Sequence, residues 1–141
     1  MEIDAEEVTP LTNLDVLQYL KELQESRHKV NNQQTLIYTS LKYFKEKTSC
    51  SHQTEEQILN FRLCVQAYKL SEAEERSLLD LLPTSQVELS LLIRDIDARF
   101  SQDQIQAILK LIETHFIDAH KNQQILIGNT EDEEEVVNVN K

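Results

Sequence analysis

The sequence predicts an all-α fold in which N-terminal helices precede a small helical bundle. Its 141 residues include one Gly and two Pro, which leaves few residues for the tight turns of β-hairpins. Four Ser or Thr residues, at positions 54, 71, 85 and 101, are each followed three residues later by Glu or Gln. This pattern is the capping box that begins a helix. The 14 to 17 residues between successive boxes suit a three-turn helix and a short link.

The N-terminal part begins with an acidic segment, residues 1–10, which we expect to be flexible. Thr12, with Asp15 three residues later as its capping partner, predicts a first helix that continues towards Lys29. Its large apolar residues recur mostly at helical spacing. They are Leu14, Val16, Leu17, Leu20 and Leu23.

A polar connector and a second helix follow in this interpretation. Residues 31–34 read Asn-Asn-Gln-Gln, and Asn competes for its own backbone and disfavours helix, so we expect a connector there. A second helix is predicted from about residue 35 to residue 47. One of its faces is apolar and carries Ile37, Leu41 and Phe44.

The bundle is predicted from the capped helices that follow a loop at residues 48–52. Pro83 ends one helix, and a turn at Arg99 and Phe100 separates the next two, which we expect to pack as a hairpin. The last helix carries a long apolar stripe. The predicted core of the bundle is Phe61, Val65, Leu92, Ile96, Ile105, Ile108, Leu109 and Ile112.

The net charge of −11 is concentrated at the two ends of the chain. Residues 131–135 are five consecutive acids, whereas residues 8–130 contain 16 acids and 13 bases. We therefore expect residues 119–141 to form an acidic, disordered tail. Nucleic-acid binding by counterion release needs clustered Lys and Arg, so the sequence predicts at most indirect contact with nucleic acid.

Two groups of residues could suggest a metal site or catalysis. Cys50, His52 and Cys64 lack the second pair of ligands that a closed zinc site needs, and Cys64 is expected at the core or its boundary. His115 and His120 lack a nucleophile in a strained turn. We therefore predict no catalytic residue, cofactor, metal or small-molecule ligand.

Charged residues near the end of the bundle are expected to form exposed ion pairs without a functional role. They are Glu88, Arg94, Asp95, Asp97 and Arg99. The sequence also lacks a signal peptide and an apolar run near 18 residues, which predicts a soluble intracellular protein without a membrane segment.

The first helix is predicted to contact another protein, because a bundle of residues 54–116 does not need its apolar stripe. The alternative is that this stripe packs on the second helix of the same chain. The residues expected to bind the partner are Leu14, Val16, Leu17, Leu20, Leu23, Ile37 and Leu41.

Three stretches resemble the small stalk subunits of DNA-directed RNA polymerases, a family with members in polymerases II and III and in the archaeal polymerase. They are LTNLDVLQYL (11–20), SLKYF (40–44) and the long stretch 69–109, and the resemblance covers residues 11–118. Compact length and the 97–100 turn favour the polymerase III member over the polymerase II member. The most specific positions are Lys69, Leu70, Glu74, Pro83, Glu88 and the turn DARF at 97–100.

The resemblance implies partner-docking helices at residues 11–48 and an HRDC-like helical bundle at residues 49–118. It implies a non-catalytic nuclear subunit that forms the stalk heterodimer with a larger subunit containing an OB-fold. This heterodimer would contact the polymerase core and the initiation factor TFIIIB and support transcription initiation on small non-coding RNA genes. The alternatives are a polymerase II stalk subunit, a stand-alone HRDC module that binds nucleic acid, and a cytosolic component of a peptide-hormone (CGRP) receptor complex.

Overall fold

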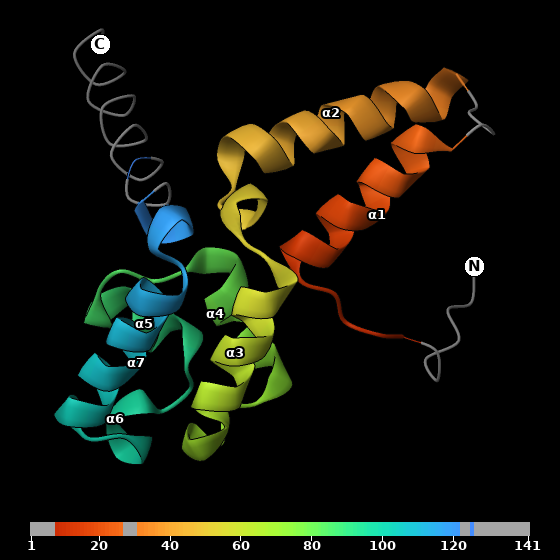
Figure 1. Ribbon diagram of the computed structural model, residues 1–141. Helices are drawn as coiled ribbons and strands as arrows, with labels where there is room; N and C mark the ends of the chain where they lie inside the picture. Colours follow the sequence, from red (N-terminus) through yellow and green to blue (C-terminus); the bar gives the residue numbers. More distant parts are fainter. Residues whose placement is uncertain (1–7, 27–30, 122–124, 126–141) are drawn as a thin grey trace, which may run out of the picture.

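The computed structural model describes residues 8–26, 31–121 and 125, and these residues contain helices but no strand, so the predicted all-α class is confirmed. Figure 1 shows their arrangement. Residues 117–121, after the last labelled helix, are also helical. The helices are α1 (Asn13–Glu25), α2 (Asn31–Lys47), α3 (Glu55–Val65), α4 (Glu72–Leu81), α5 (Gln86–Leu92), α6 (Ile96–Arg99) and α7 (Gln102–His115), with short 3₁₀ helices η2 (Cys50–His52) and η3 (Gln66–Tyr68).

All the predicted capping boxes form and begin a helix where the sequence indicates one. At the start of α7, the Gln104 backbone N–H donates to Ser101 Oγ at 3.3 Å. The Ser101 N–H donates in return to Gln104 Oε1 at 2.9 Å. These reciprocal bonds satisfy backbone donors that a helix start leaves unpaired, which is why the starts are predictable from local sequence.

Two breaks in the helices depend on buried side chains. Leu82 adopts a left-handed φ of 42° before Pro83 while its side chain is completely buried, so α4 ends where predicted. Ile93 is extended and Asp95 has a φ of 51°, which divides the predicted helix after Ser85 into α5 and α6. The sequence does not reveal this second break, because Ile93 is a buried apolar residue that fits a continuous helix equally well.

The predicted connector at residues 31–34 is wrong, because these residues form the first turn of α2. Asn disfavours helix by only about 0.5 kcal/mol relative to Ala, and Gln is a good helix former. A penalty of that size is easily exceeded when the remainder of α2 packs on α1.

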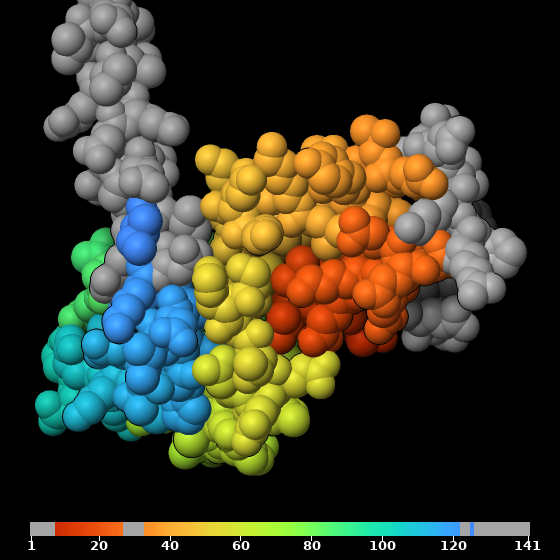
Figure 2. All heavy atoms as spheres, turned by 45° about the horizontal axis from the view of Figure 1, so that its top comes forward, coloured from red at the N-terminus to blue at the C-terminus, as the bar shows by residue number. Residues whose placement is uncertain are grey.

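The α1–α2 hairpin projects from a bundle formed by α3–α7 (Figure 1). Helix α2 makes its main contacts with α1 and η2, whereas α7 packs against α3 and α5. The space-filling view shows α2 as a ridge at the edge of the molecule, joined to the bundle through η2 and α1 (Figure 2).

One apolar core runs from the bundle into the base of the hairpin. Phe61 and Phe116 meet edge to face at its centre, with ring centroids 5.4 Å apart. Of the predicted core residues, Leu92 and Leu109 are only partly buried. Those that are buried are Phe61, Val65, Ile96, Ile105, Ile108 and Ile112.

Leu14 and Leu17 belong to the same core and are only 5% and 2% exposed. The sequence predicts that the apolar stripe of the first helix has no partner within this chain. This prediction is wrong for Leu14 and Leu17. Their burial agrees with the alternative in which the stripe packs within the chain, because α1 lies against α2 and η2. Leu14 and Leu17 are therefore covered by their own chain and are not open to another protein.

Candidate partner-docking surface

Two hydrogen bonds help to fix the hairpin to the bundle. The backbone N–H of Asn13, at the start of α1, donates to Asp80 Oδ1 in α4 at 2.8 Å. The Gln53 side chain, next to η2, donates through Nε2 to the Leu79 carbonyl oxygen at 2.6 Å. Since Leu79 and Asp80 are neighbours, both ends of the hairpin are held at one point of α4.

We expect Asp80 to act as a hydrogen-bond acceptor whose charge is dispensable. Burial raises the pKa of Asp80, and the bond from Asn13 offsets only part of this effect. Asp80→Asn keeps an oxygen acceptor and should change the free energy of unfolding by less than about 0.5 kcal/mol. Asp80→Ala leaves the Asn13 N–H unpaired and should cost about 1 kcal/mol in urea denaturation. Equal losses in both variants would show that the charge itself is needed.

Large apolar side chains on the outer sides of the hairpin are open to solvent. Leu36 is 68% and Tyr43 57% exposed, and their spacing of seven residues places them on one face of α2. Tyr38 and Tyr19 are 63% and 58% exposed. Tyr38 instead borders the groove between α1 and α2. We call Leu36 and Tyr43 the hairpin face.

The apolar pattern of the sequence does not assign the hairpin face to docking, because these residues lie off the stripes that periodicity identifies. Of the residues that it does assign, Leu14 and Leu17 are buried within the chain. The other assigned residues are half-buried and border the exposed face. They are Val16, Leu20, Leu23, Ile37 and Leu41.

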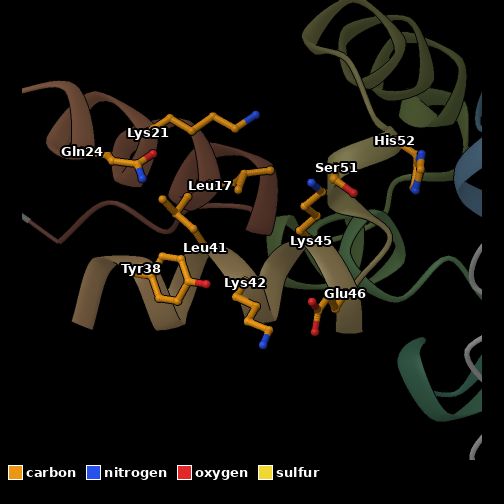
Figure 3. Close-up of a pocket in the computed structure, with 10 residues that line it drawn as sticks. All are labelled: Leu17, Lys21, Gln24, Tyr38, Leu41, Lys42, Lys45, Glu46, Ser51 and His52. Atoms are coloured by element: carbon orange, nitrogen blue, oxygen red, sulfur yellow. The ribbon is translucent and has the colours of Figure 1, made fainter. Parts of the chain in front are cut away.

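A groove of about 740 Å³ lies between α1 and α2. In Figure 3, Leu17 and Leu41 point towards each other from the two helices and form its apolar floor. Three lysines line it, Lys21 from α1 and Lys42 and Lys45 from α2. This local excess of positive charge contrasts with the acidic balance of the whole chain.

A second set of contacts lies in the bundle. It brings together residues of the stretch 69–109, which resembles stalk subunits. Arg99 donates through Nη1 to Glu74 Oε1 at 2.7 Å and through Nη2 to Oε2 at 3.3 Å. Its Nη1 also donates to the Arg94 carbonyl at 3.0 Å. Glu74 accepts backbone N–H bonds from Arg94 at 3.2 Å and from Ser71 at 2.9 Å. We call this set of contacts the Glu74–Arg99 pair.

The electrostatics of this pair favour a charged carboxylate. Burial raises the pKa of Glu74, but hydrogen bonds from Arg99, Ser71 and Arg94 outweigh it and lower the pKa to about 2. The hydrogen bond with Glu74 in turn raises the pKa of Arg99. The pair joins the start of α4 to the break before α6 and so holds these two parts of the bundle together. Both oxygens of the Glu74 carboxylate are engaged in these contacts.

The structure corrects one expectation for these charges and agrees with another. Arg99 does not form an exposed pair, because its partner Glu74 has a side chain only 11% exposed. Arg94 and Asp95 do form an exposed pair, 3.7 Å apart. Glu74 and Arg99 lie 25 residues apart, so helical periodicity alone cannot pair them, although both belong to the segment that resembles stalk subunits.

The remaining candidate residues lie in different surroundings. Cys64 is exposed, which contradicts its predicted core or boundary position, and its Sγ lies 3.7 Å from His115 Nε2. Cys50 is buried beside Thr48, and burial raises its pKa. Over the described ranges, no three His, Cys, Asp or Glu side chains converge to hold a metal. No helix in these ranges is long and apolar enough to cross a bilayer.

Comparison with known proteins gives two matches. The family model of RNA polymerase Rpb4 matches residues 10–116. The DNA-directed RNA polymerase III subunit rpc9 of Schizosaccharomyces pombe is 27% identical over 118 residues, which cover 75% of this chain and 92% of the yeast protein. The matched range includes the hairpin, the groove and the Glu74–Arg99 pair, and it stops before the acidic C-terminal segment.

Proposed function

Because the chain belongs to the RNA polymerase Rpb4 family, we propose that it is the small, non-catalytic stalk subunit of RNA polymerase III. Membership in the family confirms the resemblance that the sequence indicated. The similarity to the polymerase III subunit of Schizosaccharomyces pombe supports polymerase III over polymerase II. The net charge of −11 weighs against a stand-alone module that binds nucleic acid.

We infer that the protein forms a heterodimer with a larger stalk subunit through the hairpin face. The observation that carries this inference is the exposure of Leu36 and Tyr43 on a hairpin that stands out from the bundle (Figure 1). Tyrosine and other large apolar side chains are enriched at the centres of protein interfaces. The half-buried residues beside them, such as Leu20 and Ile37, would complete the contact.

The place of this heterodimer in transcription is also part of the proposal. The assembled stalk would present the bundle to the initiation factor TFIIIB and support transcription initiation on small non-coding RNA genes in the nucleus. Helices that are firmly packed around one core suit such a role, since a rigid surface loses little entropy on binding.

Substitution of exposed hairpin residues tests the docking surface without disturbing the core. Leu36→Asp combined with Tyr43→Asp should weaken binding to the larger subunit at least tenfold, measured by titration calorimetry with purified partners. Both side chains are mostly exposed, so the thermal midpoint of the isolated chain should change little.

The matched control lies on the bundle. Leu59 and Leu63 of α3 are 60% and 64% exposed, so Leu59→Asp with Leu63→Asp adds the same charge to an apolar patch outside the hairpin. We expect this control to bind the larger subunit normally. If the control loses affinity and the hairpin variant does not, the partner binds α3 and the assignment of the hairpin is wrong.

A further inference from the structure

We propose that the groove between α1 and α2 binds an acidic segment of the same chain, residues 131–137. This inference does not depend on the polymerase assignment. It rests on the charge and shape of the groove, on the sequence of the segment and on the place where the described chain ends.

The groove combines an apolar floor with a positively charged rim. Leu17 and Leu41 meet at the floor (Figure 3). Lys21, Lys42 and Lys45 outnumber the single acid of the lining, Glu46. Such a groove favours an extended ligand that carries several carboxylates next to an aliphatic residue.

Residues 131–137 have this composition, since they read Glu-Asp-Glu-Glu-Glu-Val-Val. The five acids can pair with the lysines of the rim, and Val136 and Val137 can contact the apolar floor. The acids near the N-terminus, at residues 2, 4, 6 and 7, are interrupted by other residues and have a single valine after them. The C-terminal segment is therefore the better match within this chain.

The end of the described chain lies on the side of the molecule where α2 ends (Figures 1 and 2). Ile125 precedes Glu131 by six residues, and six extended residues span about 20 Å. Lys45 lies in the last turn of α2. A tethered ligand has a local concentration in the millimolar range, so weak ionic contacts suffice for binding.

Zero-length carbodiimide cross-linking of the full chain tests the proposal, because it joins a lysine only to a carboxylate in contact with it. Mass spectrometry should find Lys42 and Lys45 linked mainly to residues 131–135 at low ionic strength. The yield should fall at least fivefold in 1 M NaCl, where the Debye length is about 3 Å. A mixture of ¹⁵N-labelled and unlabelled chains distinguishes links within one molecule from links between two.

Two variants serve as probe and control. Val136→Ser with Val137→Ser keeps the number of carboxylates unchanged but removes the aliphatic contact, and it should reduce the yield severalfold. Neutralising the N-terminal acids, by Glu2→Gln, Asp4→Asn, Glu6→Gln and Glu7→Gln, should leave the yield unchanged. Equal linkage to lysines outside the groove, such as Lys69 and Lys110, would overturn the proposal. Dominant linkage to residues 2–7, or between labelled and unlabelled chains, would overturn it in favour of the N-terminus or a second copy.

Discussion

Replacing Leu17 by Asp is expected to lower the free energy of unfolding by about 3–5 kcal/mol. Leu17 is 2% exposed and lies in the core that the hairpin shares with the bundle, so the new carboxylate would be buried without a partner. Denaturant titration followed by circular dichroism measures this loss. Loss of binding to a partner in this variant would reflect the damaged fold, so Leu17 is a poor position for testing the interface.

Tyr19→Asp is the matched control for Leu17→Asp. It places the same charge in the same helix two residues away, where the native side chain is 58% exposed. We expect a change of less than about 0.5 kcal/mol in the free energy of unfolding. If Leu17→Asp were equally harmless, the packing of α1 on its own chain would be refuted, and the stripe would be free for a partner.

Replacing Glu74 by Gln is expected to cost about 2 kcal/mol of stability near neutral pH. The substitution removes the charge that pairs with Arg99 and turns an amide NH₂ towards N–H donors. The expected loss is moderate because the Arg99 side chain is 32% exposed, and solvent screens the pair. Glu72→Gln, in the same helical turn but exposed, should have an effect several times smaller.

The cost of Glu74→Gln should depend on pH with a definite sign. The folded-state pKa of Glu74 is about 2, well below the ordinary value of 4.5. Between these values the unfolded chain binds the proton more readily, so acid removes the stabilisation provided by Glu74. The difference between the native chain and the variant should be complete above about pH 4.5 and shrink as the pH falls towards 2. A difference that stays constant over this range would show that Glu74 does not act through its charge.

Local sequence determined the beginnings of the helices and the family of the protein. A capping box such as Ser101 with Gln104 acts within one turn, so its residues identify the helix start wherever the helix later packs. The order and spacing of the apolar and charged positions between residues 11 and 118 were likewise sufficient to indicate the RNA polymerase Rpb4 family, which the match over residues 10–116 confirms. The predicted domain boundaries, the HRDC-like character of the bundle and the partner contacts stay predictions, and the predicted acidic ends lie largely outside the described residues.

Only the tertiary structure decided which apolar side chains of the hairpin are free and which charges pair. The sequence assigns Leu17 to an interface and does not single out Tyr19, but α2 and η2 cover Leu17 and leave Tyr19 exposed. Glu74 and Arg99 meet because the chain breaks at Ile93 and Asp95 and returns to the start of α4. Periodicity describes neighbours within one helix, whereas these contacts join residues far apart in sequence, and only the packing of several helices around one core brings them together.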